Sequence, residues 1–386
     1  MLKRQIFFNF LKNNFLSNTI IVLLSLLMTF AILEVYVRIF LPKNDLNVLT
    51  GTASGKNPME QWAFLDAFSA YKPKPGKYVE GNGEGKTVNR YGFISTPEIS
   101  IAKPADTIRI VFLGGSSTAG TGVNLKDTDT WPWKTVEMIR AKTSKKVDFI
   151  NAAAGGYCSF ESYGRLWSRI RYFSPDIVVV YHGWNEMYYF KEVDNIILWR
   201  TLGDGSWSFE KTHRPITYYE PKWIDPLIKW SQALIRIRLR IYKQGLAGET
   251  GPHEPSKLAS GFDHRGLDIW RTNLKLIREA CKIFGAKLFV SKQATLIVPD
   301  LPMEERKRCR YDYHGFDHDA HIEAFQGIYD VIDQEIPAGY IIDTTKISGQ
   351  PECFYDHVHL TPQGTTEVAA IISEALIPAI QKRENN

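Results

Sequence analysis

Five short segments of this chain are apolar almost throughout, and segments with helical spacing separate them. The strand-like segments are Ile108–Leu113, Val147–Ala153, Asp176–Tyr181, Lys287–Ser291 and Tyr340–Asp343. The helical segments are Thr130–Ala141, Phe160–Tyr172, Leu267–Phe284, His321–Gln334 and Thr361–Ile380. Strands that are apolar on both faces are typical of a parallel sheet covered by helices on both sides. The sequence therefore predicts an α/β fold.

A separate apolar stretch lies near the amino terminus, from Thr19 to Leu41. It reaches the ~20 residues that an α-helix needs to cross a bilayer. Glu34 and Arg38 lie four residues apart within it, so they can pair on one helix face near the lipid headgroups. The alternative is a cleaved signal peptide, but no small-residue cleavage site follows the apolar run. We therefore expect an uncleaved membrane anchor.

The basic residues before this stretch predict its orientation. Lys3, Arg4 and Lys12 precede it with no acidic residue among them. Because positive charge favours the cytoplasmic side, the amino terminus is expected in the cytoplasm and the bulk of the chain outside it.

The predicted organisation has four parts. Residues 1–18 are a cytoplasmic tail, 19–41 the transmembrane anchor, and 42–105 a juxtamembrane spacer that extends the domain. Residues 106–386 form the α/β domain, which an insertion at about 188–262 interrupts.

Inside the insertion, residues 222–243 carry six basic residues and one acid, with apolar residues at helical spacing. A basic amphipathic helix of this kind lies on a membrane or roofs a cleft. A helix packed on the domain with a solvated basic edge fits the pattern equally well. Both interpretations stay open.

The net charge limits the kinds of partner that the chain can have, and the cysteines indicate which thiols are buried and which can pair. The net charge of +5 is mild, and no dense block of Lys and Arg indicates nucleic-acid binding. Cys158 and Cys281 fall in predicted core elements and are expected to be buried thiols. Cys309 and Cys353 fall in predicted loops, and outside the cytoplasm we expect a disulfide between them.

Polar and glycine-rich sequences follow the predicted strands. The first strand is followed by Gly114-Gly115-Ser116-Ser117, the second by Asn151–Gly156 and the third by His182–Glu186, while Phe354–Gly364 precedes the closing helix. In open parallel sheets, sites gather at the carboxyl ends of the strands. These segments are therefore expected to meet at one edge of the sheet.

The residue types in these segments suit acyl transfer. A serine hydroxyl such as that of Ser116 needs an adjacent base, which His359 can provide, and Asp356 can orient the imidazole. Acyl transfer also needs donors where the oxyanion develops. The backbone N–H groups of Ser116 and Gly156 and the side-chain amide of Asn185 can supply three.

Taken in this order, the segments resemble the GDSL/SGNH hydrolase superfamily, whose four motif blocks carry Ser, Gly, Asn and His. The resemblance covers Thr107 to Leu376 apart from the insertion, and Asn89–Phe93 resembles a segment that precedes the domain in some bacterial members. It implies a flavodoxin-like three-layer α/β/α fold with five parallel strands. It also implies a triad and an oxyanion hole without metal or cofactor, formed by Ser116, Gly156, Asn185, Asp356 and His359.

Three positions depart from the family pattern. The usual Gly-Asp-Ser is Gly114-Gly115-Ser116 here, Gly-x-Asn-Asp is Gly183-Trp184-Asn185-Glu186, and the first glycine of the second block is Ala153. None of these changes removes a catalytic group. Ser117 is the rival nucleophile, although the register places Ser116 at the catalytic position.

Three functions are compatible with this set of residues. The first is an extracytoplasmic serine esterase that acts on an acylated glycan or lipid. The second is an O-acyltransferase that passes the acyl group to a polysaccharide or cell-wall glycan. The third is an inactive binding module on the same fold.

A polar cluster outside these motifs needs a separate explanation. Asp312–His321 holds three His and three Asp within ten residues. Such a cluster can bind a metal, but no recognisable ligand motif anchors it. A solvated entry into the following helix is the favoured interpretation.

Overall fold

The structure is a computed structural model. It describes residues 2–41, 63–78, 85–191 except 122 and 124, then 223, 225–238, 240 and 258–381. Most of the predicted insertion and part of the predicted spacer therefore lie outside the described residues. The chain divides into two compact units, residues 1–61 with 217–249 and residues 62–216 with 250–386, which we describe separately.

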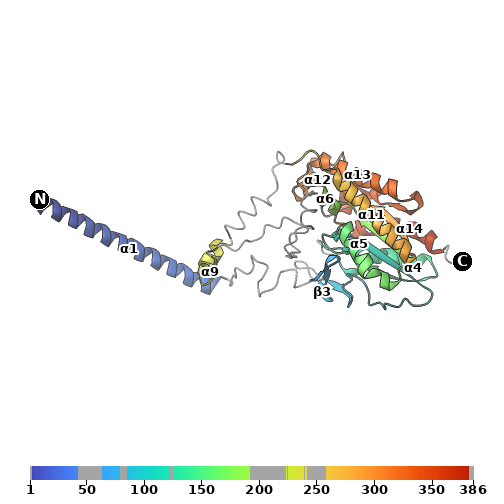
Figure 1. The fold of residues 1–386 in the computed structure, drawn as a ribbon, viewed down its shortest axis with the longest axis horizontal. Coiled ribbons are helices and arrows are strands. Elements are labelled where there is room, and N and C mark those ends of the chain that lie inside the picture. Colours follow the sequence, from blue (N-terminus) through green and yellow to red (C-terminus); the bar gives the residue numbers. More distant parts are fainter. Residues whose placement is uncertain are drawn as a thin grey trace. The chain divides into compact units, whose positions relative to one another are not determined.

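A five-stranded parallel sheet forms the centre of the second unit (Figure 1). Its strands are β5 (Thr107–Gly114), β6 (Lys146–Asn151), β7 (Ile177–His182), β8 (Lys287–Lys292) and β9 (Ile341–Asp343). Their order is β6-β5-β7-β8-β9, which is the flavodoxin-like order. All neighbours pair in parallel, and every residue of β7 is buried. The predicted fold class is confirmed.

Helices cover both faces of this sheet. On one face α4 packs against α14, and on the other α11 packs against both α5 and α13. These helices are α4 (Trp131–Lys142), α5 (Ser159–Ser168), α11 (Arg265–Phe284), α13 (His318–Glu335) and α14 (Pro362–Gln381). Shorter helices in this unit are α3 (Ser116–Ala119), α6 (Tyr188–Lys191) and α12 (Met303–Arg306). Single 3₁₀ turns are η2 (Asp127–Asp129), η3 (Ile170–Phe173), η4 (Trp184–Met187), η6 (Tyr311–Tyr313), η7 (Ala338–Tyr340), η8 (Thr345–Ile347) and η9 (Pro351–Cys353).

Two small antiparallel pairs precede the main sheet within the same unit. Strand β1 (Ala63–Asp66) pairs with β2 (Ala70–Pro73), and β3 (Gly76–Tyr78) pairs with β4 (Lys86–Val88). Strands of only three or four residues are too short to show alternation in the sequence. The Asn89–Phe93 segment that follows ends in Phe93, a fully buried member of the main core.

All four cysteines are unpaired and buried, so the expected disulfide between Cys309 and Cys353 is not formed. The Sγ atom of Cys309 lies 4.0 Å from the carbonyl oxygen of Glu305, and that of Cys353 lies 3.8 Å from the side-chain oxygen of Gln350. Each thiol therefore fits a local pocket instead of facing the other. The prediction was wrong because both loops are packed into the core, which loop position in the sequence does not reveal.

The first unit contains a long helix, α1 (Leu2–Phe40), which begins well before the predicted span. Its part from Asn18 to Phe40 has a mean hydropathy of 2.5 and is the one helix, among the described residues, that is long and apolar enough to cross a membrane. The predicted pair on this helix is formed, with Arg38 Nε 2.6 Å from Glu34 Oε1. The same unit holds α9 (Asp225–Ile228) and helical residues 232–238, so Ser231 divides the predicted basic helix.

Candidate active site

The strand-to-helix turn after β5 has space for glycine alone at two positions. A Cβ atom on Gly114 would lie 2.1 Å from Thr118 Oγ1 and 2.8 Å from the carbonyl oxygen of Tyr181. A Cβ atom on Gly115 would lie 2.5 Å from Nδ2 of Asn185. The two glycines therefore let the chain leave the buried strand and bring Ser116, the first residue of α3, beside Asn185.

Ser116, His359 and Asp356 form one chain of hydrogen bonds. His359 Nε2 lies 2.8 Å from Ser116 Oγ, and His359 Nδ1 lies 2.7 Å from Asp356 Oδ2. With Nδ1–H donating to the carboxylate, Nε2 is left to accept the serine proton. The structure thus brings together the three residues that the sequence placed in the triad, and the arrangement can activate a serine hydroxyl.

The loop that carries Asp356 and His359 is held by short-range contacts. The second carboxylate oxygen, Asp356 Oδ1, accepts the backbone N–H groups of Val358 and His359, both at 2.9 Å. The backbone N–H of Tyr355 also donates to the carbonyl oxygen of His359 at 2.7 Å. Burial alone would raise the pKa of Asp356, but the hydrogen bonds from His359 and the neighbouring imidazoles hold it well below its usual range.

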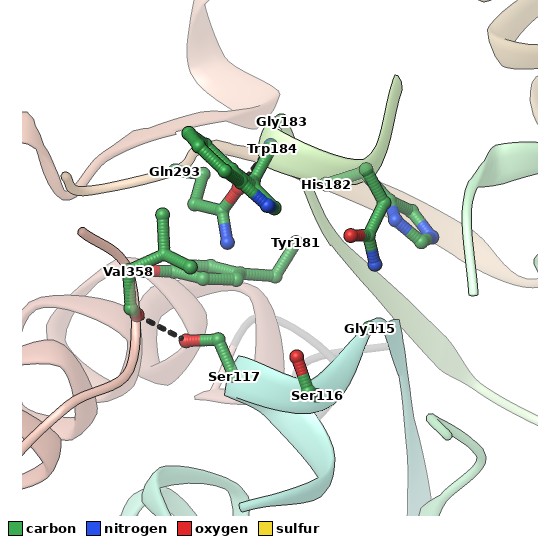
Figure 2. Close-up of a pocket in the computed structure, with 10 residues that line it drawn as sticks. Gly115, Ser116, Ser117, Tyr181, His182, Gly183, Trp184, Gln293 and Val358 are labelled. Carbon is green, nitrogen blue, oxygen red and sulfur yellow. Dashed lines mark hydrogen bonds between the residues drawn. The ribbon is translucent and has the colours of Figure 1, made fainter. Parts of the chain in front are cut away.

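Ser117, the alternative nucleophile, makes a different hydrogen bond from Ser116. The hydroxyl of Ser117 donates to the carbonyl oxygen of Val358 at 3.0 Å, as the dashed line in Figure 2 shows. A hydroxyl that donates its proton to a backbone carbonyl has no base to accept that proton. The geometry therefore favours Ser116 over Ser117 as the reactive hydroxyl.

Two of the three expected oxyanion donors, Gly156 and Asn185, lie on neighbouring loops. Asn185 Nδ2 donates to the carbonyl oxygen of Tyr157 at 2.8 Å, which ties the loop after β7 to the loop after β6. Gly156 has a φ of 78°, and the N–H of Tyr157 bonds the carbonyl of Ala154 around it. A turn of this kind requires a positive φ at its third position, which explains glycine there. An amide carries two N–H donors, so Asn185 can hold this loop and still face a substrate.

Behind Asn185 lies a buried polar network that the sequence did not predict. The backbone N–H and the hydroxyl of Ser159 both donate to the Glu186 carboxyl group, each at 2.7 Å, and Asn273 donates to the Ser159 hydroxyl at 2.9 Å. Burial raises the pKa of Glu186 to about 8 and lowers that of His182, 3.6 Å away, to about 3. Both groups are therefore uncharged at neutral pH. Glu186 thus connects the loop after β7 to the start of α5, behind Asn185.

A small pocket opens beside Ser116. Its volume is about 10 Å³, and its lining is Gly115, Ser116, Ser117, Tyr181, His182, Gly183, Trp184, Asn185, Gln293 and Val358. Figure 2 shows Trp184 and Gln293 across the pocket from the two serines. The backbone N–H of Trp184 donates to Gln293 Oε1 at 2.7 Å, which holds these two walls together. Sequence reasoning missed Gln293, although a polar residue directly after β8 was a signal for it.

Three buried histidines pack around Trp184. The ring centroids of His357, His314 and His321 lie 3.9, 4.3 and 5.1 Å from the tryptophan ring. Two of these belong to the cluster that was expected to be solvated. The cluster does lead into a helix, because Asp317 caps α13 by accepting the N–H of Ala320, but His314 and His321 are buried against Trp184. Within the described part of the chain, no three His, Cys, Asp or Glu side chains are grouped to hold a metal ion.

No family model and no curated protein matches this sequence. Three of the solved structures that match are an acetyl xylan esterase, a GDSL-like lipase from Bacteroides thetaiotaomicron and a lipase/acylhydrolase from Enterococcus faecalis. They are 15, 14 and 16% identical, cover 70, 71 and 70% of this chain and 100, 88 and 96% of their own, and have TM-scores of 0.39, 0.35 and 0.39. The similarity of this chain to these solved structures is one of structure, at low sequence identity.

Proposed function

We propose that this protein is a membrane-anchored serine esterase that cleaves its substrate through an acyl-enzyme on Ser116. The observation that carries the proposal is the hydrogen-bond chain from Ser116 through His359 to Asp356. A serine hydroxyl bonded to an imidazole that is itself oriented by a partly buried carboxylate is the arrangement that nucleophilic acyl transfer needs.

Each group has a defined role in this mechanism. His359 Nε2 takes the proton from Ser116 Oγ as that oxygen attacks the ester carbonyl carbon. The N–H groups of Ser116 and Gly156 and the amide of Asn185 stabilise the oxyanion that forms. His359 then gives its proton to the alkoxide oxygen of the leaving alcohol, which leaves the acyl group on Ser116. Water, activated by His359, attacks this acyl-enzyme and releases the acid and the free serine.

The pocket beside Ser116 indicates a small acyl group. The leaving alcohol has to be near His359, which does not line the pocket, so the acyl substituent points toward Trp184 and Gln293. A cavity of about 10 Å³ holds one water-sized group, which suits the methyl of an acetyl ester. One of the similar structures is named an acetyl xylan esterase, and an acetylated glycan is the substrate class that we propose here.

The anchor is the second part of the proposal. The helical segment Asn18–Phe40 is long and apolar enough to span a bilayer, and the basic residues before it favour a cytoplasmic amino terminus. The domain of residues 106–386 then acts outside the cytoplasm. Protease added to the cytoplasmic side of sealed vesicles should leave the carboxyl terminus intact, and its removal would contradict this orientation.

A chain-length series of p-nitrophenyl esters tests the enzymatic proposal. We expect kcat/KM to fall steeply from acetyl to butyryl, because the longer chain has no room beside Trp184. The Trp184→Ala variant should reduce the ratio of kcat/KM for the acetyl ester to kcat/KM for the butyryl ester. Failure of the full-length protein to hydrolyse any ester faster than its Ser116→Ala variant would contradict an esterase.

An added sugar acceptor distinguishes hydrolysis from transfer. An esterase releases free acetate whether or not a glycan is present, whereas an O-acyltransferase forms an acetylated glycan at the expense of acetate. Mass spectrometry of the glycan measures this directly, and p-nitrophenol release that requires the acceptor and yields acetylated glycan in place of free acetate would favour the transferase.

A further inference from the structure

The first unit contains a contact between two segments that are far apart in sequence. The Glu34 carboxylate, near the end of α1, accepts four hydrogen bonds. Two come from the backbone N–H groups of Gln232 and Ala233, at 2.8 and 2.9 Å, and the others come from the Ser231 hydroxyl at 2.8 Å and Arg38 Nε at 2.6 Å. Arg38 also donates to the carbonyl oxygen of Trp230 at 2.5 Å.

This contact works as a helix cap supplied by another helix. The first N–H groups of a helix have no partner within it, and a carboxylate satisfies them and favours the positive end of the helix dipole. Glu34 does this for the helical residues 232–238. Val37, one turn further along the same face of α1, is also buried. The end of α1 and the segment around Ser231 are therefore joined by specific polar contacts.

The joined segment exposes large apolar side chains. Trp223 is 82% exposed, Trp230 is 74% exposed and Leu227 is 67% exposed, while Ile228 and Ile235 form a small buried cluster with Leu234 beneath them. Exposed tryptophans next to a spanning helix are typical of the membrane–water interface, where the ring has an apolar body and a polar N–H.

The charged residues of this segment also favour the membrane–water interface. The described residues 225–238 and 240 contain one acid, Asp225, and four basic residues, which are Lys229, Arg236, Arg238 and Arg240. Basic residues that flank apolar side chains attract the anionic headgroups of a bilayer. A helix packed on the domain with a solvated basic edge would account for the basic residues but not for the exposed tryptophans.

We propose that residues 223–240 form a second membrane contact, which lies in the headgroup region of an anionic bilayer and is fastened to the anchor by Glu34. The partner is the lipid surface into which α1 inserts. The proposal rests on α1 spanning that bilayer and is independent of the chemistry at Ser116. It makes the interior of the insertion a membrane-bound element rather than a roof for the active site.

Nitroxide labels on the full-length protein in vesicles that contain phosphatidylglycerol test the contact. The four native cysteines are buried, so labelling is directed to an introduced one. A label on Leu227→Cys should be accessible to oxygen and protected from a water-soluble nickel chelate. A label on Ile283→Cys, an 81% exposed apolar position of the other unit, should be accessible to the chelate.

A third label, on Leu27→Cys, distinguishes the proposed membrane span of α1 from the proposed lipid contact around Leu227. Leu27 is 64% exposed within the proposed span, so its label should also be protected from the chelate. Chelate access at Leu227→Cys with protection at Leu27→Cys would overturn the lipid contact alone. Access at both positions would overturn the span and with it the contact. Protection at Leu227→Cys that appears only when a protein partner is added would also contradict the proposal.

A separate experiment tests whether the Glu34 carboxylate holds the segment around Ser231. Hydrogen–deuterium exchange at the amides of Gln232 and Ala233 should accelerate in Glu34→Ala, because both N–H groups lose their acceptor. The Glu34→Gln variant keeps one acceptor oxygen and should show a smaller acceleration. Exchange that is unchanged in Glu34→Ala would show that the carboxylate does not hold this segment.

Discussion

The two halves of the candidate active site are built in different ways. In the triad half, Asp356 and His359 are three residues apart and are held by hydrogen bonds within one loop. In the oxyanion half, Gly156 and Asn185 come from different strand ends and are joined through buried contacts that include Glu186. Changes in the triad half should therefore affect the rate with little effect on stability. Changes in the oxyanion half should affect both.

The largest effect is expected from His359→Ala. Without its base, Ser116 is a poor nucleophile, and kcat should fall by roughly 10⁶-fold while the midpoint of thermal unfolding changes little. The pKa of Asp356 is held below its usual range, so its carboxylate stays ionised and can orient the imidazole.

Steady-state kinetics and thermal unfolding of the variant measure these two effects. Wild-type activity in His359→Ala would show that His359 is not the base. His357 provides a matched comparison, because it is a buried imidazole that faces Trp184 instead of Ser116. His357→Gln should therefore keep most of the activity that His359→Ala loses.

A smaller loss is expected from Asn185→Ala in the other half. Removing one oxyanion donor costs about 10²- to 10³-fold in kcat. Because the same amide donates to the carbonyl oxygen of Tyr157, the variant should also unfold at a lower denaturant concentration than His359→Ala does. Equal stability of the two variants would contradict the distinction between the halves.

The smallest effect on the rate is expected from Glu186→Gln, which preserves the shape of the side chain. Its clearer effect is on the pH dependence of stability. The pKa of Glu186 is about 8 in the folded protein and 4.5 for an ordinary glutamate, so between these values the folded state keeps a proton that the unfolded chain releases. The free energy of unfolding therefore falls as pH rises through this window, by at most about 1.4 kcal/mol per pH unit.

Glutamine does not titrate, so the stability of Glu186→Gln relative to wild type should increase from pH 5 to pH 8. Urea unfolding at the two pH values measures the difference. A stability difference that is the same at both would show that Glu186 is not protonated in the fold. Glu186→Ala, which also loses both contacts to Ser159, should be less stable than wild type at either pH.

The same distinction explains what the sequence could predict. The strands, the long helices and the triad follow from local patterns, because Asp356 and His359 are close in sequence and Ser116 directly follows a strand. The network around Glu186 depends on Ser159 and Asn273, which only folding brings together. Cys309 and Cys353 were misassigned for a related reason, because their burial depends on long-range packing of loops.

Gln293 was missed even though it also follows a strand. The residues that acyl transfer requires at the strand ends do not include a glutamine that shapes a pocket. Its contact with the backbone of Trp184 depends on how β7 and β8 pair. The chemistry of the site was therefore more predictable than the shape of its pocket.

Covalent labelling of Ser116 is the most direct test of the central claim. A fluorophosphonate reacts with a serine only when a base activates it. Peptide mass spectrometry of the full-length protein should place the adduct on Ser116. The Ser117→Ala variant should still be labelled and the Ser116→Ala variant should not. Labelling of Ser116→Ala to the wild-type level, or an adduct on Ser117, would contradict the account.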